Sequence, residues 1–181
     1  MAKLEEEFLK REQIYDGRVL NVVCDTVRLP DGKEATRELC LHIGAVAVLP
    51  LLTDGTVILE RQYRHAHGRV MLEIPAGKLN SSDEDRLEAA KRELREETGA
   101  VAKKWTELGM LIPTPAIVNE KIWMFLAEDI EFTDTELDDD EFIDVVRIPL
   151  DELCKMVMRG EVADAKTQIC ALKVTELKRV K

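Results

Sequence analysis

Three glutamates and two arginines stand within eight residues, in the stretch RELREETG at positions 92–99. On a helix, where each residue advances by about 100°, Glu93, Glu96 and Glu97 share an arc roughly 100° wide. This arc borders the apolar stripe to which Leu94 belongs, so the three carboxylates are expected to be only partly solvated. Glu93 and Glu97 also stand four residues apart, where like charges on a helix repel each other.

Two interpretations of this carboxylate group are open. One is an ion-paired helix surface facing solvent, which the pair Glu88 and Arg92, four residues apart, favours. The other is a metal site, because partly buried like charges require a counter-charge and carboxylate oxygens suit Mg²⁺ or Mn²⁺. Helix geometry alone does not decide between them.

The helix that carries the glutamates is expected to begin near Ser81 or Ser82. A serine N-cap followed by acidic residues stabilises a helix start. Leu87 and Ala90 lie on the stripe that would face the core. Gly99 is the expected end, because glycine readily adopts the left-handed conformation that terminates helices.

Apolar runs separated by turn residues predict β-strands on both sides of this helix. Two pairs of runs, in residues 18–42 and 44–64, flank a Pro-Asp-Gly and a Thr-Asp-Gly turn and are expected to form hairpins. Further strands are expected in KKWTELGMLIP, KIWMFLAED and IDVVRIP, followed by helices in LDELCKMVMRG and DAKTQICALKVTELKRV. Many strands and few helices, not in strict alternation, predict a mixed α/β layered fold.

The composition indicates a globular protein that does not bind nucleic acid. The 181 residues include 36 acids against 26 bases, a net charge of −10 that repels nucleic acid. No apolar run approaches the roughly 18 residues of a membrane span, and the start MAKLEEEFLKREQ lacks the apolar centre of a secretion signal. A cytoplasmic location is predicted. The four cysteines form no CxxC or Cys/His cluster, which favours scattered buried thiols.

Residues 77–100, GKLNSSDEDRLEAAKRELREETGA, resemble the Nudix box, G-x5-E-x7-R-E-U-x-E-E-x-G-U, in which U is apolar. From Glu84 onward every defined position of the box matches. Six residues rather than five separate Gly77 from Glu84, so either the loop carries an insertion or Asp83 takes the place of the glutamate. The resemblance favours the metal site and implies the Nudix fold, in which mixed β-sheet layers are sandwiched by helices.

The same resemblance implies the residues of a metal site. Glu93, Glu96 and Glu97 would bind Mg²⁺ (or Mn²⁺) together with the backbone carbonyl of Ala76, and Arg92 would brace the carboxylates. Bound metal would neutralise a diphosphate and lower the pKa of the attacking water.

Other segments are similar to the ADP-ribose pyrophosphatase branch of the family. These are GAVAVLPLLTDGTVILERQYRHA, LEIPAGKL, DEFIDVVRIPLDEL and GEVADAKTQICAL, together with Pro115 about fifteen residues beyond the box. The branch hydrolyses ADP-ribose to AMP and ribose 5-phosphate and often accepts other nucleoside diphosphate sugars. Counting back from RGEVADA places Glu141, in the acidic loop TDTELDDDEF, at the position of the general base, so Glu141 and Glu96 are the expected catalytic residues.

Diphosphate recognition requires cations, and the expected substrate-binding residues are Arg37, Arg61 and Arg64. Arg64 matches a substrate-contacting arginine of the branch, and Arg61 shares its strand end. The resemblance divides the chain into an N-terminal antiparallel β extension, residues 1–43, and a Nudix domain, residues 44–181. In the branch such an extension commonly builds a homodimer and lines the site.

Two alternatives to a nucleotide-sugar hydrolase are open. One is a Nudix enzyme acting on nucleoside triphosphates or dinucleoside polyphosphates, against which the N-terminal strands and Pro115 speak. The other is a non-catalytic ADP-ribose-binding sensor, which usually lacks a metal glutamate, whereas this box has all three.

Overall fold

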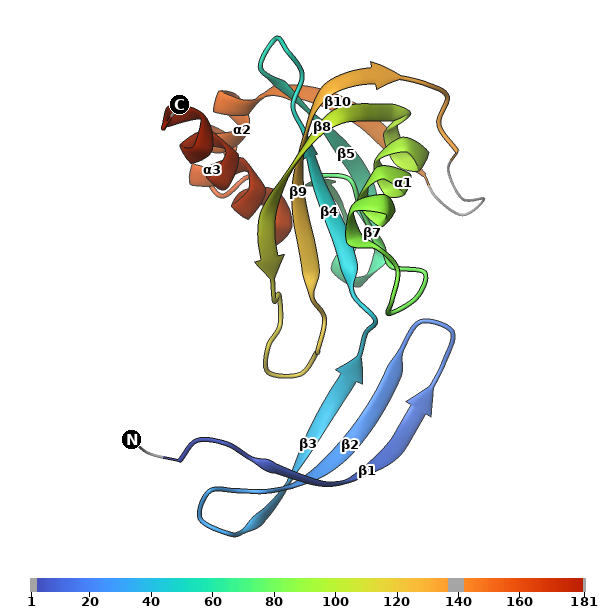
Figure 1. The fold of residues 1–181 in the computed structure, drawn as a ribbon, viewed down its shortest axis with the longest axis vertical. Coiled ribbons are helices and arrows are strands. Elements are labelled where there is room, and N and C mark those ends of the chain that lie inside the picture. The colour runs from blue at the N-terminus through green and yellow to red at the C-terminus, as the bar shows by residue number, and fades with distance from the viewer. Residues whose placement is uncertain (1–2, 137–141, 181) are drawn as a thin grey trace. The chain divides into compact units, whose positions relative to one another are not determined.

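The computed structural model describes residues 3–136 and 142–180 (Figure 1). Ten strands, three α-helices and a short 3₁₀ helix occur in the described residues. In chain order they are β1 (Glu7–Asp16), β2 (Asn21–Arg28), β3 (Glu34–Leu41), β4 (Ala45–Pro50), β5 (Thr56–Arg64), η1 (His65–His67), β6 (Arg69–Glu73), β7 (Ala76–Lys78), α1 (Arg86–Thr98), β8 (Ala100–Leu111), β9 (Ile122–Phe132), β10 (Ile143–Pro149), α2 (Leu150–Met158) and α3 (Ala165–Arg179).

The chain divides into two units, each interrupted in sequence. The first comprises Met1–Ile43 and Ile112–Lys121, and the second comprises Gly44–Leu111 and Ile122–Lys181. Among the described helices, none combines the length and the hydropathy that crossing a bilayer requires.

The first unit is built on an antiparallel sheet in the order β1-β2-β3. Arg11 donates from Nε and Nη2 to the two carboxylate oxygens of buried Asp25, each at 2.7 Å, which ties β1 to β2. The backbone N–H of Cys40 donates to the carbonyl of Ile117 at 2.8 Å and so joins residues 112–121 to β3. The pairing of β2 with β3 confirms the hairpin predicted in residues 18–42, whereas β1 was not predicted as a strand.

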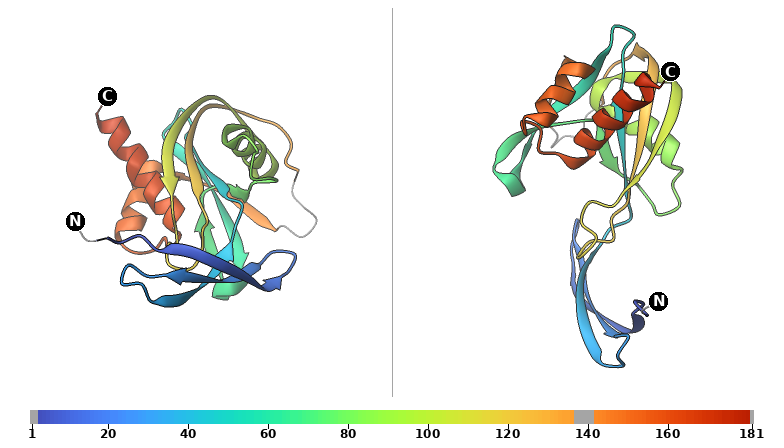
Figure 2. Two further views of the ribbon diagram at one scale, coloured as in Figure 1. Left: turned by 60° about the horizontal axis from the view of Figure 1, so that its bottom comes forward. Right: turned by 90° about the vertical axis from the view of Figure 1, so that its left-hand side faces the viewer.

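The second unit contains two sheets. One is four-stranded in the order β7-β4-β9-β8, with β4 and β9 parallel, and the other is antiparallel in the order β10-β5-β6. Helix α1 lies on one side of the four-stranded sheet, and α2 and α3 lie on the other (Figure 2). The mixed layered fold predicted from the pattern of strands and helices is confirmed.

Alternating side chains of β4 explain the helices on both faces. Ala47 and Leu49 belong to the apolar core shared with α2 and α3, whereas Val46 and Val48 belong to the core shared with Leu94 of α1. All four β4 residues are fully buried, so the strand requires a covering layer on each side. As the covering layer on one face, α1 packs against β4, β7 and β8.

Two details of the sequence-based prediction are wrong. Helix α1 begins at Arg86 rather than near Ser81, because the side chain of Asp85 accepts the N–H groups of the first turn and acts as the N-cap. The strands predicted in residues 44–64 exist, but β4 does not form a ladder with β5 and instead pairs with β9 and β7. Complete burial of β4 favours a central position with a neighbour on each edge.

Two smaller predictions can also be compared with the structure. Gly99 ends α1 with a φ of 68°, which confirms the predicted glycine stop. All four cysteines are free thiols, but only Cys170 is fully buried, so the expectation of buried thiols holds for that residue alone.

Candidate functional site

Arg92 holds together the acidic face of α1. Its Nη1 donates to Glu93 Oε1 at 2.7 Å and to Glu96 Oε2 at 3.1 Å, and its Nη2 lies 3.4 Å from Glu84 Oε1. Burial alone would lower the pKa of Arg92, but the neighbouring carboxylates outweigh burial and raise it. The prediction that Arg92 braces the carboxylates is confirmed.

The strand β7 lies against this acidic face. Glu97 is 6% exposed, and its Oε2 accepts the backbone N–H of Ala76 at 3.0 Å. A Cβ on Gly77 would lie 2.1 Å from Oε2 of Glu93, so only glycine leaves room for that carboxylate. β7 and α1 thus bring the Ala76 backbone, Glu93 and Glu97 together.

The donor groups at this place suit a hard divalent cation, because carboxylate and carbonyl oxygens are what Mg²⁺ and Mn²⁺ prefer. Glycine at position 77 also leaves the Glu93 carboxylate room beside β7, which fits a cradle of oxygen ligands. Among the described residues, no three His, Cys, Asp or Glu side chains converge as a ready-made metal site. In the arrangement observed, Glu93 and Glu96 face Arg92, and Glu97 faces Ala76.

Arg64, at the end of β5, is held by a buried carboxylate. Its Nε and Nη2 donate to the two oxygens of Glu73, at 2.7 and 2.9 Å, and Lys166 Nζ donates to Glu73 Oε2 at 2.5 Å. Burial would raise the pKa of Glu73, but the hydrogen bonds and charges of Arg64 and Lys166 lower it to about 2. The pKa of Arg64 is raised, chiefly by its hydrogen bonds to Glu73, and the charge of Glu97 contributes. The charge of Glu97 on α1 therefore reaches Arg64.

The other predicted substrate residues, Arg61 and Arg37, have different ion-pair partners. Arg61 is exposed, and its Nη1 lies 4.0 Å from Asp144 of β10. Arg37 belongs to the first unit, where its Nη2 donates to Glu6 at 2.5 Å. Glu141 lies outside the described residues.

Sequence reasoning missed several buried polar residues near Arg64. Glu60 is 3% exposed and lies opposite Glu73 in the β5–β6 pairing. Lys166 and Thr167 of α3 are also buried and bind the segment around Glu73. The sequence hinted at the burial of Glu60, because this residue directly follows the apolar run TVIL. It gave no hint of the contacts of Lys166 and Thr167, because each lies 93 residues after its partner.

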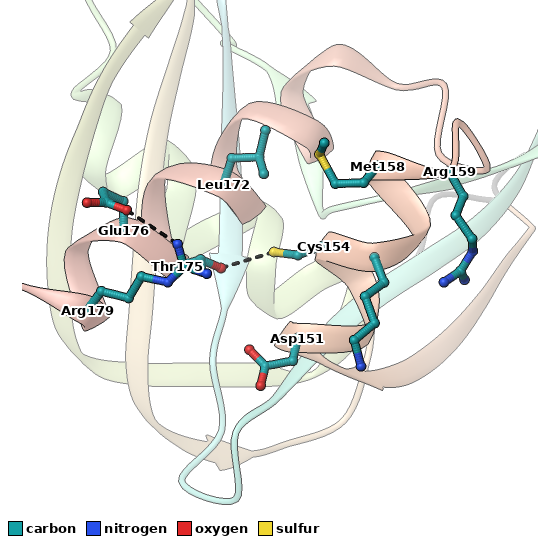
Figure 3. A pocket seen from close by; sticks show the side chains of 9 residues that line it. Asp151, Cys154, Met158, Arg159, Leu172, Thr175, Glu176 and Arg179 are labelled. Atoms are coloured by element: carbon teal, nitrogen blue, oxygen red, sulfur yellow. Dashed lines mark hydrogen bonds and ion pairs between the residues drawn. The ribbon is translucent and has the colours of Figure 1, made fainter.

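A separate groove of about 780 Å³ lies between α2 and the C-terminal half of α3 (Figure 3). Its cations already have acidic partners: Arg159 pairs with Glu152 and Glu161, and Arg179 pairs with Glu176. The groove is not lined by any of the box glutamates. It therefore lies apart from the candidate site.

Comparison with known proteins decides the family. The family model described as NUDIX domain matches residues 41–169, and the model described as nucleoside diphosphate sugar hydrolase N-terminal domain matches residues 6–39. This chain belongs to the Nudix hydrolase family. The family predicted from the box is thereby confirmed.

Relatives of this Nudix hydrolase align along most of its length. It is 41% identical over 169 residues to an ADP-ribose pyrophosphatase of Bacillus subtilis (strain 168), covering 92% of this chain and 91% of the relative. It is 36% identical over 172 residues to a methanol dehydrogenase activator of Bacillus methanolicus, covering 93% and 92%. Among solved structures, an ADP compounds hydrolase matches with a TM-score of 0.85 at 24% identity, covering 98% of this chain and 96% of that one. The last match confirms the Nudix fold with an N-terminal antiparallel sheet.

Proposed function

We propose that this Nudix hydrolase cleaves the diphosphate bond of ADP-ribose and related nucleoside diphosphate sugars. The products are a nucleoside monophosphate and a sugar phosphate. The observation that carries the proposal is the carboxylate face of α1 packed against Ala76 and Gly77, with Arg64 within reach of the charge of Glu97. The N-terminal domain match and the ADP-ribose pyrophosphatase relative support the substrate class.

Within the proposal, Glu93, Glu96, Glu97 and the carbonyl of Ala76 hold Mg²⁺ or Mn²⁺. Bound divalent ions supply charge neutralisation of the diphosphate and a lowered pKa for the attacking water. Arg92 would hold these carboxylates in place, since its Nη1 donates to one oxygen of each, Glu93 Oε1 and Glu96 Oε2.

The remaining roles fall to residues that contact the substrate or the water. Arg64 binds the diphosphate, because a guanidinium matches phosphate oxygens with paired donors. Arg61 and Arg37 are proposed as weaker contacts. Glu96 and Glu141 assist the water as catalytic residues.

We further propose that the chain is a homodimer formed through residues 1–43, with 44–181 as the Nudix domain. Phe8, Ile14 and Tyr15 of β1 are more than half exposed, an apolar surface that a second copy would cover. Sedimentation should give a dimer for the full chain, and a monomer at micromolar concentration would refute this part.

The function is tested by turnover of a substrate panel with Mg²⁺ and by two matched variants. ADP-ribose, GDP-mannose, UDP-glucose, ATP and diadenosine polyphosphates are supplied, and the products are separated by ion-exchange chromatography. A nucleotide sugar should be preferred, and chelation should stop the reaction. Turnover confined to ATP or the polyphosphates refutes the substrate class, and tight ADP-ribose binding without turnover indicates a sensor.

The variants are Glu97→Gln and Glu88→Gln, both on α1. The glutamine oxygen at position 97 can still accept the N–H of Ala76, so the fold should remain while turnover is abolished. Glu88 is exposed and pairs only with Lys91 among the described residues, so its variant should retain activity. An active Glu97→Gln enzyme would overturn the metal assignment.

A further inference from the structure

The N-terminal turn of α3 binds two consecutive residues of the segment that leads into β7. Lys166 Nζ donates to Glu73 Oε2 at 2.5 Å, and Thr167 Oγ1 accepts the backbone N–H of Ile74 at 2.8 Å. Asp164, the N-cap of α3, accepts from Lys166 Nζ at 3.0 Å and from Thr167 Oγ1 at 2.6 Å. Both α3 residues are buried, Lys166 at 9% exposed and Thr167 at 0%. Buried hydrogen bonds therefore hold the first turn of α3 on Glu73 and Ile74.

Glu73 is shared between this turn and Arg64. Arg64 uses Nε and one hydrogen of Nη2 to bind both oxygens of Glu73, which leaves the Nη1 edge of the guanidinium for another anion. The Glu73 side chain is 5% exposed and that of Arg64 is 40% exposed, so the guanidinium forms the outer part of the pair. Glu73 sets the orientation of Arg64, and Lys166 fixes Glu73.

The charges of the four ion-paired side chains in this cluster balance one another, and the buried Glu60 opposite Glu73 is a further carboxylate beside them. Arg64 and Lys166 carry two positive charges, and Glu73 and Asp164 carry two negative charges. Loss of the Lys166 charge would leave one excess negative charge within a few ångströms of Arg64, the residue proposed to bind the diphosphate. Charge repulsion and a freed Glu73 rotamer would both weaken diphosphate binding.

We propose that Lys166 is a positioning residue of the hydrolase, which directs Arg64 toward the diphosphate by fixing the carboxylate of Glu73. The inference rests on the proposed function, in which Arg64 binds the diphosphate. Lys166 itself does not contact the substrate. Its effect is on substrate binding more than on the chemical step.

Steady-state kinetics of single variants give the first test. Lys166→Met should raise KM about tenfold or more, as loss of a supporting partner commonly does, with a much smaller change in kcat. Lys166→Arg should recover much of the loss, because it restores the charge and the donors. Lys178→Met is the matched control, since Lys178 on the same helix pairs with Glu128 and should leave KM unchanged. If Lys166→Met does not fold, Lys166→Gln keeps a donor without the charge and should show the same rise in KM. An unchanged KM, or a fall in kcat alone, would overturn the proposal.

A double-mutant cycle with Arg64→Ala separates positioning from a general structural role. If Lys166 acts through Arg64, Lys166→Met should add little to the KM of Arg64→Ala. Full additivity of the two effects would refute the inference. A failure of the proposed function appears in the wild-type protein as turnover of a different diphosphate substrate. The cycle is then run on that substrate, so a failure of the inference appears only in the variants.

Discussion

Replacing Glu73 by glutamine should make the stability of the protein less dependent on pH between about 5 and 2. The folded pKa of Glu73 is about 2, whereas an unfolded glutamate has a pKa of about 4.3. A carboxyl group whose pKa is lower in the folded state stabilises that state above the unfolded pKa. This stabilisation is lost as the pH falls from the unfolded toward the folded pKa.

The size of the effect follows from the difference between the two pKa values. A difference of roughly 2 pH units corresponds to about 3 kcal/mol in the free energy of unfolding. Glu73→Gln should therefore be about 3 kcal/mol less stable near neutral pH, because Arg64 and Lys166 lose their shared anion. Below about pH 4.3 the gap should close by about 1.4 kcal/mol for each pH unit.

The assay is urea unfolding of both proteins at several pH values from about 6 down to about 3. Tryptophan fluorescence reports the transition through Trp105 and Trp123. Glu131→Gln is the control, because this exposed partner of Lys103 should change the free energy of unfolding far less. If the stabilities of the wild type and Glu73→Gln run parallel across the whole range, Glu73 does not hold its charge in the way described.

Three further substitutions test separate parts of the site. Gly77→Ala should cut turnover at least about tenfold but leave the melting temperature nearly unchanged, because the new Cβ displaces only the flexible carboxylate of Glu93. Normal activity of this variant would contradict the prediction. Thr167→Val removes the buried acceptor of the Ile74 N–H and should cost about 1–3 kcal/mol in urea unfolding, and a cost near zero would contradict this bond. Asp85→Ala removes the N-cap of α1 and should cost about 1 kcal/mol, whereas Asp85→Ser should recover most of the loss.

Local patterns carried most of what could be predicted. Most of the strands and the glycine end of α1 follow from residues close together in the chain, where turn chemistry and helix spacing act directly, whereas the bracing role of Arg92 was implied by the family resemblance. The start of α1 was placed too early because Ser81, Ser82 and Asp85 are all acceptable N-caps. Only the backbone path in three dimensions selects Asp85.

Long-range partners could not be predicted in the same way. The apolar run of β4 indicates burial but does not say that β9, more than seventy residues later, supplies its parallel neighbour. Nothing in the sequence distinguishes Lys166 from an exposed helix lysine, and only the folded structure shows its bond to Glu73. The metal ligands were assigned through family resemblance rather than helix geometry, and these assignments stay predictions.

The bonds from α3 to Glu73 and Ile74 each span 93 residues, and this separation has a consequence for how the protein is made. Contacts close in the chain, such as the β5–β6 hairpin and the first turn of α1, can form early, whereas closing a loop of this length is slow. A growing chain that has completed β5, β6 and α1 has its carboxylates and Arg64 but lacks Lys166. Under the proposed function, full affinity for a diphosphate would therefore arise late in synthesis, when α3 docks onto Glu73 and Ile74.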